Sequence, residues 1–252
     1  MPRAWLRELN PGRLVFPPVC EICDSPLSTG EQAEMPFLCG SCVPLMTPVS
    51  DRCCHLCGQV FEGPALSTLQ CSNCRDRELG FDFAVSPYRS KGVMRDLMHE
   101  YKYSRQIHLA RLFGKCLTEV WQDSRLTAGK WVVVPVPLHR KRYRERHFNQ
   151  AREISSIFVK LSPPEMDLKL RPLLKRVRYT VRQAQLDRDL RLKNLQSAFD
   201  VPVFQRKERY QGCRFLIVDD VLTTGSTASE CASVLRRYFD PEEIVAISVL
   251  RG

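Results

Sequence analysis

The sequence contains no apolar run that approaches the length of a membrane-spanning helix. Residues 1–10 also lack the apolar core that a secretory signal requires. No set of Ser, His and Asp, or of Cys and His, marks a nucleophilic hydrolase. We therefore expect a soluble cytoplasmic protein that does not insert into a membrane and whose chemistry does not depend on a nucleophilic side chain.

Acidic residues are fewer than basic ones, with 28 Asp plus Glu against 38 Lys plus Arg and a sequence pI near 9.1. The excess is concentrated in two runs. Residues 140–152 hold six basic residues and one acid, and residues 169–193 hold nine basic residues and two acids. Such runs face either anions or water, so polyphosphate ligands and nucleic acid are both candidate partners.

Cysteine is abundant, and eight of the 12 cysteines form four C-x-x-C pairs. Two such pairs supply the four thiolates of a tetrahedral zinc site. The spacings, fifteen residues between the first two pairs and thirteen between the last two, favour two successive zinc ribbons. The candidate ligands are Cys20, Cys23, Cys39, Cys42, Cys54, Cys57, Cys71 and Cys74.

The zinc sites are expected to be structural, because four thiolates leave no open coordination position. In addition, a segment of about sixty residues buries too little surface to fold without a bound metal. A nucleic-acid or partner-docking surface is the alternative role. Cys53 leaves the register of the third pair open, and interleaved pairing of the four pairs is also open. His55 is expected to be exposed rather than a ligand. The remaining cysteines, Cys116, Cys213 and Cys231, lie in apolar patterns typical of a core.

The rest of the chain alternates strand and helix patterns, which predicts an α/β fold with a parallel sheet flanked by helices. We expect a tail at 1–17, the double zinc ribbon at 18–78 and the larger domain at 79–252. Strands are expected at 81–88, 131–136, 214–218 and 244–250, and helices at 93–103, 107–121 and 148–161.

The most informative segment is Phe215–Thr227, which reads FLIVDDVLTTGST. Four apolar residues indicate a strand buried on both faces, and the apolar stripe that starts at Ala228 predicts a following helix. The hydroxyl run Thr223–Thr227 therefore lies at a helix N-terminus, where unpaired N–H groups and the helix dipole favour a phosphate. The carboxylates of Asp219 and Asp220 precede it and are candidates to hold sugar hydroxyls or a metal.

Two further segments are candidates for the same site. A basic loop is expected after Val136, at the carboxyl edge of the sheet, where it would meet a diphosphate or simply face water. The polar segment Arg178–Leu186 is either a lid that closes over a ligand or an ordinary loop.

The Phe215–Thr227 segment resembles the phosphoribosyl-diphosphate (PRPP) signature of type I phosphoribosyltransferases. The whole chain resembles the ComF/GntX family, whose members join a double zinc ribbon to a phosphoribosyltransferase domain and are associated with competence and DNA uptake. Besides the C-x-x-C pairs and the acidic strand end, the matching segments are Tyr101–Tyr103, Val134–Pro137, Arg146–Gln150, Gln185–Leu186 with Arg191 and Asn194, and Ala198–Phe199.

The resemblance implies a type I phosphoribosyltransferase-like fold and transfer of a phosphoribosyl group from PRPP to a base or nucleotide. Asp219 and Asp220 would hold the ribose, and Mg²⁺ would accompany the diphosphate. The 5′-phosphate would bind Thr223, Thr224, Gly225, Ser226 and Thr227, and the diphosphate would meet Arg140, Lys141 and Arg182.

His147 stands where the family usually has glycine, so a left-handed backbone there would be strained. Two alternatives to a transferase stay open. One is a protein that binds single-stranded DNA within a DNA-uptake machinery, and the other is a regulator that senses PRPP with little or no activity.

Overall fold

The computed structural model describes residues 18–50, 52–61, 71–178 and 197–252. Contacts between Cα atoms divide the chain into two compact units, Met1–Met46 and Thr47–Gly252. The first unit therefore contains the first cysteine cluster, and the second unit contains the other cluster together with the sheet. The boundary expected near residue 78 stays a prediction.

The first unit contains the short helix α2 (Thr29–Glu34) and a 3-10 turn at Val43–Leu45. Ser28 and Glu31 form a capping box at the start of α2, in which each side chain accepts the backbone N–H of the other residue. Glu31 Oε1 also accepts the N–H of Gly40 at 3.0 Å. This contact ties the helix to the segment between Cys39 and Cys42.

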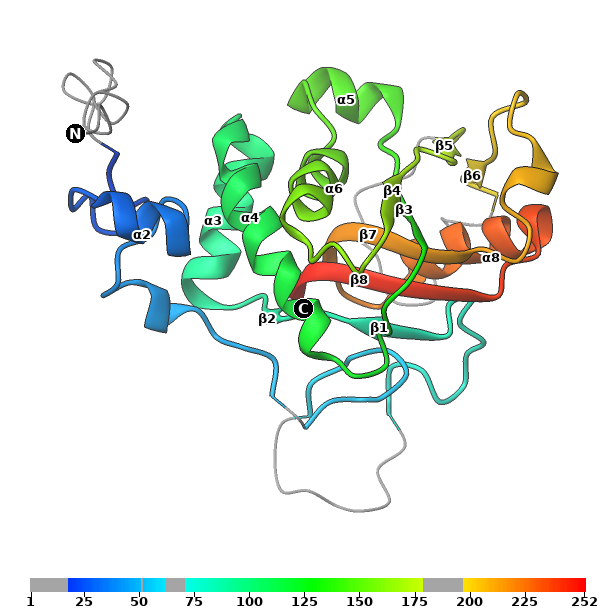
Figure 1. The fold of residues 1–252 in the computed structure, drawn as a ribbon, viewed down its shortest axis with the longest axis horizontal. Helices are drawn as coiled ribbons and strands as arrows, with labels where there is room; N and C mark the ends of the chain where they lie inside the picture. Colours follow the sequence, from blue (N-terminus) through cyan, green and yellow to red (C-terminus); the bar gives the residue numbers. More distant parts are fainter. Residues whose placement is uncertain (1–17, 51, 62–70, 179–196) are drawn as a thin grey trace, which may run out of the picture. The chain divides into compact units, whose positions relative to one another are not determined.

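A parallel sheet forms the centre of the second unit (Figure 1), which confirms the predicted fold class. The strand order is β1-β8-β7-β3-β4, and β2 also pairs with β8. The strands are β1 (Phe83–Val85), β2 (Tyr88–Arg89), β3 (Trp131–Pro135), β4 (Leu168–Leu170), β7 (Arg214–Leu222) and β8 (Glu243–Arg251). β7 is longer than expected, so Asp219 and Asp220 belong to the strand itself.

Helices cover both faces of this sheet. α8 (Ser226–Phe239) packs in one core cluster with Val132, Phe215 and Ile244. Neighbouring strand residues point to the opposite face, where α4 (Ala110–Leu117) packs against β8 and α6 (Gln150–Leu161) packs against β7. Figure 1 shows α4 and α6 side by side. The expected helix at 107–121 is broken into α4 and flanking 3-10 turns, Ile107–Leu109 and Thr118–Gln122.

Several shorter elements complete the second unit. α3 (Gly92–Tyr103) precedes α4, and β5 (Lys175–Arg176) pairs antiparallel with β6 (Phe199–Asp200). A 3-10 turn follows at Lys207–Arg209. The expected lid, Arg178–Leu186, has only its first residue within the described part of the chain, and Arg182 lies outside it.

The basic segment after Val136 is not the loop that the sequence suggested. Residues Arg140–Arg146 form helix α5, and His139 caps it by accepting the N–H of Lys141 at 3.2 Å. Arg, Lys and Glu have high helix propensity, but the segment has no apolar periodicity. The loop prediction was therefore wrong here, because it relied on periodicity alone.

His147 ends helix α5 in the left-handed region, with φ 66° and ψ −8°. Its N–H donates to the carbonyl of Tyr143 at 2.7 Å, which closes the last turn. The left-handed region costs a residue with a Cβ atom roughly 1–2 kcal/mol, whereas glycine adopts it freely. The strain expected from the missing glycine is therefore present at this turn.

We predict that His147→Gly raises the free energy of unfolding by about 1 kcal/mol, because glycine removes the clash of Cβ at positive φ. Urea denaturation followed by circular dichroism measures the change. His147→Ala is the matched control, because alanine keeps Cβ and should give no such gain. Equal stability of the two variants would contradict the strain.

Candidate functional site

A cavity of about 510 Å³ opens at the carboxyl edge of the sheet. The end of β7 and the start of α8 form one wall, and residues from α3, α5 and β5 form the others. Six residues predicted from the sequence line it, namely Asp219, Asp220, Thr223, Gly225, Ser226 and Thr227. Four cationic residues that were not chosen as ligands line it as well, namely Lys102, Arg142, Arg146 and Arg176.

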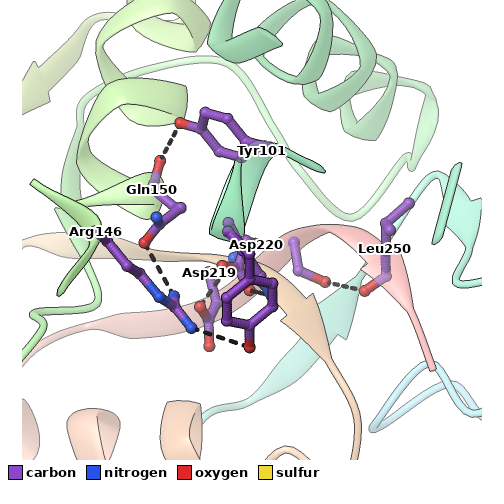
Figure 2. Close-up of polar contacts among 9 residues, drawn as sticks. Tyr101, Arg146, Gln150, Asp219, Asp220 and Leu250 are labelled. Atoms are coloured by element: carbon purple, nitrogen blue, oxygen red, sulfur yellow. Dashed lines mark hydrogen bonds and ion pairs between the residues drawn. The ribbon is translucent and has the colours of Figure 1, made fainter. Parts of the chain in front are cut away.

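The two carboxylates are neighbours on strand β7, so their side chains leave it on opposite faces. Asp220 forms an ion pair with Lys102 of α3, with 2.7 Å between Oδ1 and Nζ. Asp219 interacts electrostatically with Arg176 of β5 and with Cys231 of α8. The two acids therefore interact with residues from different elements of the fold, although both line the same cavity. Figure 2 shows the two acids and the surrounding polar contacts.

Burial, reinforced by the negative charge of Asp220, raises the pKa of Asp219 from 3.8 to about 7. The charge of Lys102 and the N–H of Asp220, which donates to Asp219 Oδ1 at 2.9 Å, oppose this shift only in part. Near neutral pH, both the protonated and the ionised form of Asp219 are therefore populated. A cation or a hydrogen-bond donor that entered the cavity would favour the ionised form.

The cations of the cavity come from separate elements. Arg142 and Arg146 lie one turn apart on α5 and face the cavity, whereas Arg140 and Lys141, predicted as ligands, are exposed and do not line it. Burial and the neighbouring Arg142 lower the pKa of Arg176 to about 10, so this residue stays charged at neutral pH. Residues four apart lie on the same face of a helix, so Arg142 and Arg146 would have been predicted to face the cavity together if α5 had been recognised as a helix.

The hydroxyl loop enters α8 through Gly225, whose φ is 74°. A Cβ atom at this left-handed residue would be strained and would lie 3.4 Å from the ring of Phe81. Thr223, Ser226 and Thr227 line the cavity, but Thr224 does not, and its carbonyl accepts a hydrogen bond from Arg77 at 2.8 Å. The start of α8 thus faces the cavity, as expected for an anion site.

The Arg146–Gln150 segment fastens α5 and α6 beside the cavity. Asn149 caps α6 by accepting the N–H of Arg152, and its Nδ2 donates to the carbonyl of Val136 at 3.0 Å. Gln150 is only 1% exposed, and its Oε1 accepts a hydrogen bond from Arg146 (Figure 2). The backbone carbonyl of Gln150 accepts a second hydrogen bond, from the hydroxyl of Tyr101. These contacts hold the guanidinium of Arg146 beside the acidic end of β7.

The cysteine pairs form two separate clusters that pair in sequence order, which confirms both predicted zinc sites. Within each cluster the four Sγ atoms lie within 4.8 Å of one another, and the closest pairs are 3.6 Å apart. Zn–S bonds of about 2.3 Å in a tetrahedron require S–S separations near this value, so the thiolates fit zinc. Cys53 is outside both clusters, and His55 is exposed.

We predict that the stability of the wild-type chain relative to Asp219→Asn falls as the pH rises. Because the pKa of Asp219 is about 7 in the folded state and near 3.8 in the unfolded state, the folded state binds more protons between these values. Burying the charge at higher pH therefore destabilises the wild type, whereas asparagine stays neutral.

Urea denaturation of both proteins from about pH 5 to about pH 8 measures this difference. Asp200→Asn is the matched control, because Asp200 is an exposed acid paired with Lys175 at 3.3 Å. A gap between wild type and Asp219→Asn that does not change across this range would contradict the assignment.

In the part of the chain that the structure describes, no helix has the length and apolar character needed to cross a membrane.

Comparison with known proteins gives matches over the ribbons and over most of the chain. Residues 12–76 match the double zinc ribbon domain. The DNA utilization protein YhgH of Escherichia coli (strain K12) is 30% identical over 89% of this chain and 93% of its own length. Competence protein F of Haemophilus influenzae is 30% identical over 66% of this chain and 72% of its own length. Competence protein ComFC of Bacillus subtilis is 21% identical over 93% of this chain and 95% of its own length.

The match to YhgH covers most of this chain. Since this relative is matched over nearly its whole length, the resemblance noted in the sequence is confirmed. The chain belongs to the ComF/GntX family, together with the YhgH and competence F proteins.

Proposed function

We propose that the cavity at the end of β7 binds PRPP and that the protein transfers its phosphoribosyl group to a base or nucleotide. One observation carries the proposal. Two carboxylates, the N-terminus of α8 and three guanidinium groups line the same cavity. A sugar that carries a phosphate at one end and a diphosphate at the other requires this combination of acids, amides and cations.

Each part of the ligand has a counterpart in the cavity. The 5′-phosphate would meet the loop Thr223–Thr227, and the ribose hydroxyls would donate to Asp219 and Asp220. The diphosphate would lie against Arg142 and Arg146, which replace Arg140 and Lys141 in this role, while Arg182 stays a prediction. Mg²⁺ bound to the diphosphate would supply further charge neutralisation, and the carboxylates are of the type that this ion prefers.

The reaction would replace the C1–O bond to diphosphate by a bond from C1 to a nitrogen of the acceptor. The diphosphate leaves with the bonding electrons, and C1 acquires positive charge in the transition state. An ionised Asp219 would stabilise that charge, and the arginines would stabilise the departing group. Lys102 would hold the carboxylate of Asp220 in position through their ion pair. No nucleophilic side chain is needed.

The names of the relatives connect the family to DNA utilisation and competence, and we propose a role in DNA uptake for this chain. Binding of single-stranded DNA is the second candidate function. Phe204 is 96% exposed and precedes the cations Arg206, Lys207 and Arg209. Exposed aromatic rings beside cations are the groups on which unpaired bases stack.

We predict that Asp219→Asn combined with Asp220→Asn abolishes PRPP binding, because the carboxylates that accept the ribose hydroxyls lose their charge. Calorimetric titration with PRPP and Mg²⁺ measures the affinity, and circular dichroism verifies the fold. Asp200→Asn should bind as the wild type does, since Asp200 lies on β6 and does not line the cavity. Unchanged affinity in the double variant would remove the role assigned to the acids.

To identify the acceptor, we propose to measure diphosphate release by the wild type across a panel of bases, nucleosides and DNA strands. Release with one acceptor class supports transfer. PRPP binding without release supports a regulator that senses PRPP. Retention of single strands that weakens steeply with salt, without release, favours the second candidate.

A further inference from the structure

The loop Thr223–Thr227, called the phosphate loop below, contacts residues beside the second cysteine cluster, Cys54, Cys57, Cys71 and Cys74. This cluster belongs to the same compact unit as the sheet. The turn between Cys54 and Cys57 adjoins β1, where the N–H of Ala84 donates to the carbonyl of Leu56 at 2.9 Å. The ribbon is thus fixed to the sheet beside the loop.

The turn between Cys71 and Cys74 holds the middle of the phosphate loop. Asn73, only 9% exposed, places Nδ2 at 3.4 Å from both Cys57 Sγ and the carbonyl of Thr224. Arg77 donates from Nη1 to the same carbonyl at 2.8 Å and from Nη2 to the hydroxyl of Ser226 at 3.2 Å. The side chain of Asn73 therefore contacts both a predicted zinc ligand and the loop. The side chain of Arg77 contacts the loop on both sides of Gly225.

The turn between Cys54 and Cys57 holds the start of the loop through Arg251, which is 3% exposed. Its Nε donates to the carbonyl of Cys57 at 3.2 Å, and its Nη2 donates to Gln59 Oε1 at 2.8 Å. Its Nη1 donates to the carbonyls of Leu222, at 2.8 Å, and of Thr223. A buried guanidinium needs such partners, because an unpaired charge inside a protein is strongly unfavourable.

We propose that the second zinc site positions the phosphate loop, with Asn73, Arg77 and Arg251 as the positioning residues. Their partners on the ribbon lie on cysteine turns whose geometry depends on four thiolates closing around one ion. The hydrogen bonds carry that geometry to the carbonyls of residues 222–224 and to the hydroxyl of Ser226. The proposal concerns the second cluster alone, because the first cluster belongs to the other compact unit.

A thermodynamic consequence follows from this arrangement, and it rests on the proposed binding of PRPP. If zinc at the second cluster favours the loop geometry that binds phosphate, phosphate on the loop must favour zinc retention by the same factor. PRPP should therefore raise the affinity for zinc at one of the two sites and leave the affinity at the other unchanged.

The test uses Arg77→Ala in the full chain, with Arg75→Ala as the matched control. Arg75 is an exposed arginine in the same turn, and its side chain pairs with Asp76 at 3.2 Å. In Arg77→Ala we expect the amides of residues 222–228 to exchange hydrogen faster and PRPP to bind about tenfold more weakly, because hydrogen bonds from a charged donor are lost. Metal analysis should still find both zinc ions. Arg77→Lys, which keeps a charged donor group but loses the forked guanidinium, should restore part of the affinity.

Each outcome decides the proposal. Faster exchange in Arg77→Ala with exchange unchanged in Arg75→Ala supports the coupling. If Arg77→Ala exchanges as the wild type does, or binds PRPP equally well, the coupling is wrong. If the wild type does not bind PRPP, the proposed function fails, and hydrogen exchange alone decides the coupling. Competition for zinc with a chelating dye at equilibrium provides the second measurement, and an equal gain in zinc affinity at both sites with PRPP, or at neither, would overturn the proposal.

Discussion

The site depends on the position of β7 between β3 and β8 in a sheet whose neighbouring strands are all parallel. Residues Phe215–Val218 are fully buried, so the strand is fixed on both faces before it reaches the carboxyl edge. There Asp219 and Asp220 emerge toward different layers, and the chain turns into α8 through Gly225. The ordinary rule that ligands bind beyond the carboxyl ends of parallel strands follows from this geometry.

The same constraint gives the site its electrostatic character. Burial and mutual repulsion keep the pKa of Asp219 near 7, while Lys102 neutralises Asp220. Arg142, Arg146 and Arg176 surround the acids from helix α5 and strand β5. The cavity thus holds charges of both signs, which the proposed sugar phosphate with its metal would complement. Preorganised charges of this kind cost no rearrangement when the ligand binds.

The sequence predicted the parts of the site that are local in the chain. The acids, most of the hydroxyl loop and the two zinc ligand sets each occupy a short motif with its own spacing. The cations were harder to predict, because Lys102, Arg146 and Arg176 reach the cavity from three distant segments. Helix α5 was missed because it buries no apolar face and so leaves no periodic pattern.

The contacts behind the loop could not be predicted from the sequence either. Arg77 and Arg251 lie at opposite ends of the second unit's sequence, and nothing in their neighbours marks them as partners of the loop. A left-handed His147, by contrast, was anticipated from the family resemblance, because His147 stands where the family usually has glycine and glycine adopts positive φ freely. The spacing of metal ligands and some local backbone conformations can thus be predicted from a sequence. Which residues from different layers meet at one site is known only once the fold is known.

The most direct measurement of the central claim is a crystal structure of the protein with ribose 5-phosphate. We predict that the phosphate lies against the backbone N–H groups at the start of α8 and that the ribose hydroxyls contact Asp219 and Asp220. A phosphate bound elsewhere, or a ribose that leaves both carboxylates without contact, would contradict the account.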